Sequence, residues 1–150
     1  MTFKKYELYC KPSKVGEGRY NFNETVIDSE SAYEVCRALN MHRLSREKVY
    51  ALYLDTALQL IGVVEIASGG IDGATVDMKV IYGPALTLGK CSAIILAHNH
   101  PSGRLNPSNE DIGLTNRVAK AGEILGVKLV DHIIIGETGC LSMRQEGMIN

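Results

Sequence analysis

The sequence has 150 residues, of which 45% are hydrophobic and 22% are charged, enough for one domain with a buried core. Its 16 basic and 17 acidic residues give a net charge of −1, which disfavours a protein that holds duplex nucleic acid on a large positive surface. No apolar run approaches the ~18–20 residues of a membrane span, and the first residues lack the apolar stretch of a signal peptide. We therefore expect a cytoplasmic protein without membrane contact, and the oligomeric state stays open.

The first 27 residues are polar and show no periodicity, so we expect an N-terminal arm followed by one domain over residues 28–150. The domain opens with a predicted helix to about Asn40, because Ser29 or Ser31 can cap it and apolar residues recur at helical spacing. The remaining predicted elements are strands at 48–55 and 58–67, a loop at 68–73, a helix at 78–88, a strand at 91–97, a helix from Ser108 to about Leu125, and a strand at 127–135. This order predicts an α/β layered domain with a central mixed sheet flanked by helices.

The most informative segment covers residues 98–111, which are polar and directly follow the apolar strand predicted at 91–97. His98 and His100 are two residues apart, so on an extended chain both imidazoles point to the same side. Pro101 disfavours helical geometry at His100 and preserves this arrangement. Neutral imidazoles placed in this way suit zinc, which in catalytic sites takes three protein ligands and leaves a fourth position for water.

Asp111 is the candidate for the third ligand. Ser108 and Asp111 form the S-x-x-D pattern of a capping box, which by itself marks only the start of a helix. The apolar stripe of this helix includes Leu114 and Val118, three and seven residues after Asp111, so the carboxylate points inward and needs a partner or a metal. Surface histidines and a purely structural cap are the alternatives, and the combination of both patterns favours a zinc site.

Together, His98, His100, Ser108 and Asp111 match the spacing H-x-H, seven residues, Ser, two residues, Asp. This pattern resembles the zinc signature of the JAB/MPN metalloprotease superfamily, called the JAMM motif. The runs HNHPSG and DHIIIG resemble the RadC branch, a bacterial family long labelled as DNA repair proteins, and the resemblance covers about residues 49–147. It implies a JAB/MPN-like fold, Zn²⁺ held by His98, His100 and Asp111, and hydrolysis of an amide, peptide or isopeptide bond in a peptide or protein substrate.

The superfamily also uses a glutamate from a neighbouring strand as the general base. We assign this role to Glu65, because Val63, Glu65 and Ala67 share one face of the predicted strand and a glycine-rich loop follows. Other acidic residues are less well placed, namely Glu47, Asp72 and Asp77. In this mechanism Glu65 takes a proton from the zinc-activated water and later returns it to the leaving amine. The Ser108 hydroxyl is expected to donate to the oxyanion of the intermediate.

Two alternatives remain, a non-catalytic zinc-containing binding module and a DNA-repair accessory protein. The complete signature favours an enzyme over the first. Members of the RadC branch commonly carry a helix-hairpin-helix DNA-binding module ahead of this domain, and no such pattern precedes Asp28, so DNA is a disfavoured partner. His132 lies on an apolar strand and is expected to be a hydrogen-bonded structural histidine.

Overall fold

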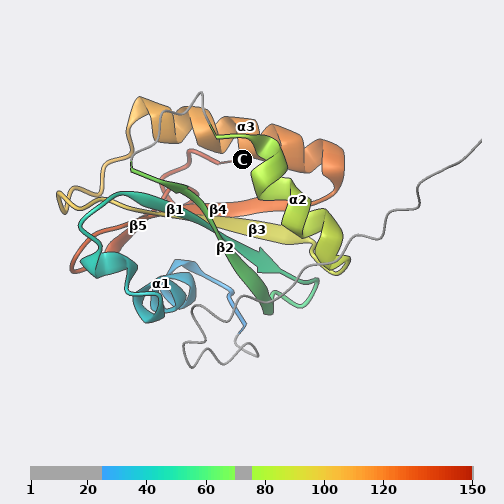
Figure 1. Cartoon of the computed structure of the whole chain (residues 1–150), viewed down its shortest axis with the longest axis horizontal. Coiled ribbons are helices and arrows are strands. Elements are labelled where there is room, and N and C mark those ends of the chain that lie inside the picture. Colours follow the sequence, from blue (N-terminus) through green and yellow to red (C-terminus); the bar gives the residue numbers. More distant parts are fainter. Residues whose placement is uncertain (1–24, 70–75, 150) are drawn as a thin grey trace, which may run out of the picture.

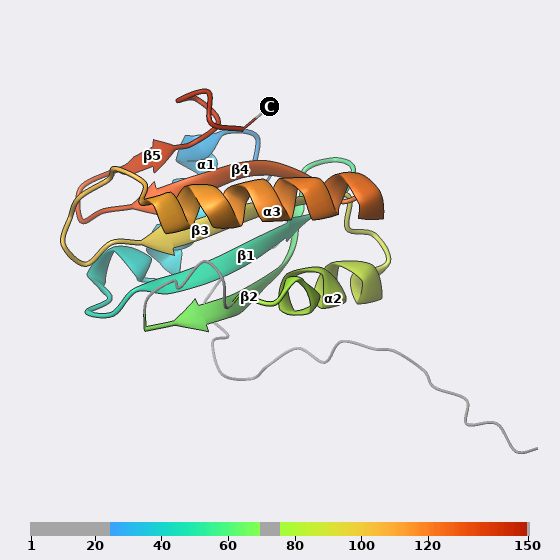
Figure 2. The same ribbon diagram turned by 90° about the horizontal axis from the view of Figure 1, so that it is seen from above.

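The structure is a computed structural model that describes residues 25–69 and 76–149. A five-stranded mixed sheet in the order β2-β1-β3-β4-β5 lies between α1 on one face and α2 and α3 on the other (Figures 1 and 2). The elements are α1 (Ser29–Ala38), η1 (Met41–Arg43), β1 (Lys48–Leu54), β2 (Leu60–Ser68), α2 (Met78–Leu88), β3 (Ala93–Asn99), α3 (Asn109–Leu125), β4 (Lys128–Ile135) and β5 (Cys140–Ser142). The predicted α/β layered domain with a central mixed sheet is confirmed. None of the helices in this part of the chain is long and apolar enough to cross a membrane.

The long elements lie where periodicity predicted them, and the differences concern short segments and a cap. Asp28, rather than Ser29 or Ser31, caps α1. The 3-10 helix η1 and strand β5 were not predicted, because three residues are too few for a periodic pattern. Residues 1–24 of the predicted arm and 70–73 of the predicted loop lie outside the described residues.

Strand β3 is buried along its whole length because helices cover both faces of the sheet. Alternate residues of the central strands therefore enter two separate cores. Leu52 and Ile95 pack on the α1 side, whereas Tyr53 and Ile94 pack against α2 and α3. This two-sided burial explains the continuous apolar run at 91–97.

Helix α3 approaches its surroundings closely at Gly122. A Cβ atom at this position would meet the Val127 carbonyl oxygen and the Tyr82 hydroxyl at under 3.0 Å. We expect Gly122→Ala to lower the free energy of unfolding by about 1–3 kcal/mol, as overpacking does. The matched control is Gly113→Ala on the same helix, which meets nothing within 4 Å and should be neutral or stabilising by up to ~1 kcal/mol. Urea unfolding of both variants measures the difference, and equal effects would contradict the close approach.

Candidate metal centre

The three predicted ligands meet at the carboxyl end of β3. His98 lies near the end of the strand, His100 directly follows it, and Asp111 lies in the first turn of α3. His98 Nδ1 is 2.8 Å from Asp111 Oδ1, and His100 Nε2 is 3.5 Å from Asp111 Oδ2. His98 and Asp111 are both buried, and the two imidazole rings stand edge to face with centroids 4.6 Å apart. The shared orientation of the histidines and the inward direction of Asp111 are confirmed, whereas metal ligation stays a prediction.

Ser108 fixes the carboxylate of Asp111 in place. The Ser108 backbone N–H and hydroxyl donate to Asp111 Oδ2 at 2.7 and 2.8 Å, and the Asp111 N–H donates to Ser108 Oγ at 3.1 Å. The predicted capping box is therefore confirmed. Burial alone would raise the pKa of Asp111, but hydrogen bonds from His100, His98 and Ser108 hold it well below its ordinary value. The hydrogen bond to Asp111 in turn raises the pKa of His100.

Loss of the Ser108 hydroxyl should weaken this arrangement measurably. Ser108→Ala removes the cap of α3 and one hydrogen bond to Asp111, so we expect the free energy of unfolding to fall by about 0.5–2 kcal/mol. Ser108→Thr keeps a hydroxyl and should recover most of that loss. Denaturant unfolding of the two variants provides the measurement, and equal stability of Ser108→Ala and wild type would show that the cap is dispensable.

Glu65 does not reach this cluster. It pairs with Tyr50 in the β1–β2 register, and its Oε2 accepts hydrogen bonds from Lys48 Nζ at 2.7 Å and from the Tyr50 hydroxyl at 3.1 Å. Tyr50 packs on the α1 side of the sheet, whereas the neighbouring Val49 pairs with His98. Because successive strand residues point to opposite faces, Glu65 and His98 lie on opposite sides of the sheet.

An irregularity in the sheet places Glu65 and Ala67 on different faces. The register shifts between Val49 and Tyr50, so that Val49 pairs with Ala67 but Tyr50 pairs with Glu65. One extra residue of β2 is accommodated there, as in a β-bulge. Val63 packs on the α1 side together with Glu65, as predicted, whereas Ala67 lies beyond the shift and packs on the other side. The prediction of a shared face is therefore wrong for Ala67.

Glu47, which the sequence pattern ranked lower, is the glutamate beside the histidines. Its Oε2 lies 4.0 Å from His98 Nε2. The buried side chain of Asn99 holds the backbone on both sides of Glu47, because its Oδ1 accepts from the Lys48 N–H at 2.7 Å and its Nδ2 donates to the Arg46 carbonyl at 3.0 Å. Sequence reasoning ranked Glu47 below Glu65 and did not identify Asn99, since only the pairing of β1 with β3 brings Glu47 close to the histidines.

His132 is a buried, hydrogen-bonded histidine, as expected. The Thr115 hydroxyl donates to the Asp111 carbonyl at 2.6 Å, so its oxygen accepts from His132 Nδ1–H at 2.7 Å. His132 Nε2 then carries a lone pair and has no hydrogen-bond partner among the described residues. Burial lowers the pKa of His132 to about 3, with a further contribution from the nearby His98.

This neutral histidine should make the metal-free protein sensitive to acid. Between pH 6.5 and about 3 the unfolded chain binds a proton at His132 that the folded chain does not, so stability falls as the pH falls through this window. The expected contribution is about 1.4 kcal/mol per pH unit. His132→Asn keeps a donor for Thr115 without the titrating nitrogen, and urea unfolding in a chelator should show a shallower pH dependence. An unchanged slope would contradict the buried neutral state.

The donor set of the cluster fits zinc. Two sets of three candidate ligand atoms lie within 4.8 Å of one another, one from Glu47, His98 and His100, the other from His98, Asp111 and His132. Imidazole nitrogen and carboxylate oxygen are both ordinary zinc ligands. Since His98 Nδ1 donates to the Asp111 carboxylate, His98 Nε2 keeps its lone pair, and this buried atom has no hydrogen-bond partner within the described part of the chain.

Comparison with known proteins identifies the family of this chain. Residues 26–148 match the family described as the RadC-like JAB domain. The chain is 44% identical over 131 residues to a UPF0758 protein of Carboxydothermus hydrogenoformans, covering 87% of this chain and 55% of that protein. It is 39% identical over 127 residues to a UPF0758 protein of Porphyromonas gingivalis, with 84% and 55% covered, and 40% identical over 124 residues to one of Thermotoga maritima, with 83% and 54% covered. The chain spans about half the length of these curated relatives.

The family match covers residues 26–148, and the relative from Carboxydothermus hydrogenoformans is 44% identical over 87% of this chain. The chain belongs to the RadC-like JAB domain family.

Proposed function

We propose that this chain is a zinc-dependent hydrolase that cleaves an amide, peptide or isopeptide bond with Glu47 as its general base. The observation that carries the proposal is the position of the Glu47 carboxylate, 4.0 Å from the buried Nε2 of His98, an atom that has no hydrogen-bond partner among the described residues. A base for hydrolysis must lie within reach of the water that it activates, either directly or through one further water. Glu47 meets this requirement and Glu65, on the opposite face of the sheet, does not.

His98, His100 and Asp111 are the residues that would hold the metal. When bound, zinc lowers the pKa of a water molecule toward ~7 and polarises the carbonyl of the scissile bond. Asp111 is prepared for this role because it is already ionised and fastened by Ser108. Burial of His98 and Asp111 strengthens every electrostatic interaction at the centre, since the surroundings have a low dielectric constant.

Glu47 would act on protons in both halves of the reaction. Its carboxylate accepts a proton from the attacking water and then donates that proton to the amine that leaves. The Asn99 side chain maintains the position of Glu47, because it is hydrogen-bonded to the backbone on either side of it. A positioned carboxylate loses less orientational freedom in the transition state than a mobile one.

Ser108 would have two functions in this scheme. In the resting structure its hydroxyl proton is directed at Asp111 Oδ2. Rotation of the hydroxyl would redirect the proton to the developing oxyanion of the substrate, while the backbone N–H of Ser108 continues to hold Asp111. The oxyanion role is therefore part of the proposal, and the capping role is independent of it.

A cleavage screen tests the proposed function directly. The zinc-loaded protein is incubated with a library of short peptides and with lysine-linked isopeptides, and new amino termini are identified by mass spectrometry. We expect cleavage that a chelator abolishes and added zinc restores. Zinc-loaded protein that cleaves neither class would contradict the proposal.

A further inference from the structure

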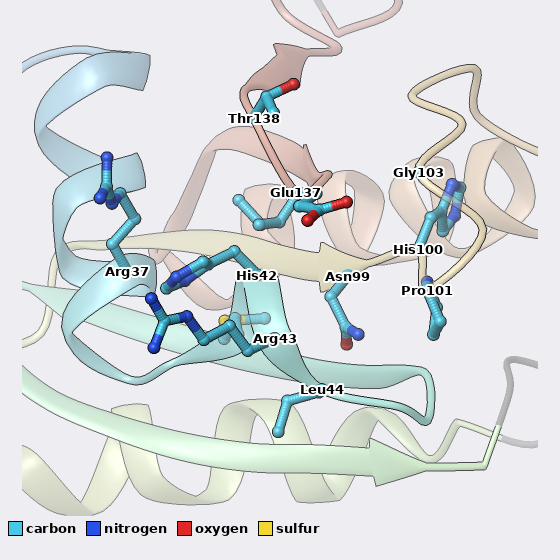
Figure 3. A pocket seen from close by; sticks show the side chains of 12 residues that line it. Arg37, His42, Arg43, Leu44, Asn99, His100, Pro101, Gly103, Glu137 and Thr138 are labelled. Atoms are coloured by element: carbon cyan, nitrogen blue, oxygen red, sulfur yellow. The ribbon is translucent and has the colours of Figure 1, made fainter.

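A pocket of about 550 Å³ opens where the two parallel strands, β3 and β4, reach their carboxyl ends (Figure 3). His100 forms part of its wall and also faces Asp111, so the pocket and the candidate metal centre share this side chain. The size lies within the roughly 300–1,000 Å³ that is usual for ligand sites. A molecule bound in the pocket would therefore reach His100, at the edge of the candidate metal centre.

Positive charge dominates this pocket. Helix α1 contributes Arg37, and η1 contributes His42 and Arg43, which lie together on the side away from His100 (Figure 3). Glu137 is the one carboxylate among the lining residues. Two guanidinium groups against one carboxylate leave the pocket with an excess of positive charge.

The side chains of Arg37, His42 and Arg43 are able to bind a ligand. Arg37 stacks over the Tyr33 ring at 5.9 Å, an interaction that does not neutralise its charge. Within residues 25–69 and 76–149, no ion pair joins Arg43 to a carboxylate. His42 Nδ1 is buried and has no hydrogen-bond partner there. The exposed guanidinium groups of Arg37 and Arg43 and the buried His42 Nδ1 are therefore available to a ligand that enters the pocket.

We propose that this pocket binds a carboxylate of the peptide substrate, which makes the chain selective for substrates with an acidic side chain or a free C-terminus close to the cleaved bond. The inference rests on the proposed hydrolase function. Guanidinium groups match the planar, two-oxygen geometry of a carboxylate and bind it more strongly than neutral donors do. The phosphate backbone of a duplex fits less well, because it needs an extended positive surface and here Glu137 faces the same cavity.

Binding of defined peptides to the full chain, without added zinc, tests the pocket. Three hexapeptides are compared by NMR titration: one with a central glutamate and an amidated end, one with glutamine instead, and the glutamine peptide with a free C-terminus. We expect a carboxylate-bearing peptide to bind about tenfold or more tightly than the neutral one, as charge-assisted hydrogen bonds predict. The glutamate and free-terminus peptides together identify which carboxylate the pocket prefers.

Matched variants assign the binding to this pocket. Arg43 is exposed, and we expect Arg43→Gln to abolish the tenfold preference for the carboxylate-bearing peptide. Arg37→Gln is a second variant with the same expected result. Circular dichroism checks that both variants are folded. Lys120→Gln removes one exposed positive charge on α3 and should keep the full preference. Equal binding of all three peptides to the wild type, a preference that survives both arginine variants, or displacement of the peptide by a duplex oligonucleotide at physiological salt would each overturn the proposal.

The design separates this inference from the proposed function. A carboxylate preference that depends on Arg43, in a protein that cleaves no peptide, would keep the pocket assignment and reject the hydrolase. Cleavage of neutral and acidic peptides at equal rates, together with equal binding, would keep the hydrolase and reject the pocket assignment.

Discussion

Glu47→Gln is expected to lower the rate of peptide hydrolysis by roughly 10²–10⁴-fold, the range for loss of a positioned acid–base group. Glutamine has nearly the same shape as glutamate but cannot accept a proton at neutral pH. The zinc content should stay that of the wild type, because Glu47 is proposed to act on water and not to hold the metal. Steady-state rates on a peptide found in the cleavage screen, combined with elemental analysis, give both quantities.

Glu65→Gln is the matched control for this experiment. It makes the same chemical change on the opposite face of the sheet, where Glu65 contacts only Lys48 and Tyr50 in the hydrogen bonds observed. Its activity should be close to that of the wild type, and the loss of its exposed ion pair with Lys48 should cost at most about 1 kcal/mol of stability. A large loss of activity in Glu65→Gln with an active Glu47→Gln would return the role of base to Glu65.

His98→Ala should remove nearly all of the zinc that the wild-type chain binds, which we expect to be one ion per chain. His98 belongs to the proposed trio and to both sets of candidate ligand atoms among the described residues, so its removal takes a ligand from each of them. The affinity for zinc should fall by more than the roughly 10–100-fold that is lost when a residue that only hydrogen-bonds to a metal ligand is removed. Elemental analysis of protein purified without added zinc measures the stoichiometry, and equal zinc in His98→Ala and wild type would eliminate the site.

Further histidine variants distinguish the proposed ligands His98, His100 and Asp111 from the buried set of His98, Asp111 and His132. We expect His100→Ala to lose zinc and His132→Asn to retain it, because the proposed ligands are His98, His100 and Asp111. His42→Ala is the control, since His42 lies in the pocket and belongs to neither set. Zinc retained by His100→Ala but lost from His132→Asn would move the metal to the buried set with His132.

Much of the candidate metal centre could be predicted because it lies within residues 98–111. Alternation along a strand brings His98 and His100 to one side, and the cap of α3 brings Ser108 against Asp111. These relations depend on local backbone geometry, which repeats every 2.0 residues in a strand and every 3.6 in a helix. The same periodicities predicted the long helices and strands, and they carry little information about η1 and β5, which are three residues each.

The choice between Glu47 and Glu65 depended on the tertiary structure. Both glutamates lie close to predicted strands, and their faces follow from the pairing of β1 with β2 and β3 and from one register shift near Val49. A single extra residue in a strand reverses the direction of the side chains beyond it, and no local pattern marks where this occurs. The pocket depended on the fold in the same way, since α1 and η1 meet the end of β3 only after the sheet has formed. The sequence by itself therefore determined the chemistry of the candidate ligands. The tertiary structure decided which carboxylate and which cationic side chains lie beside them, because long-range pairing is not encoded in the period of a single segment.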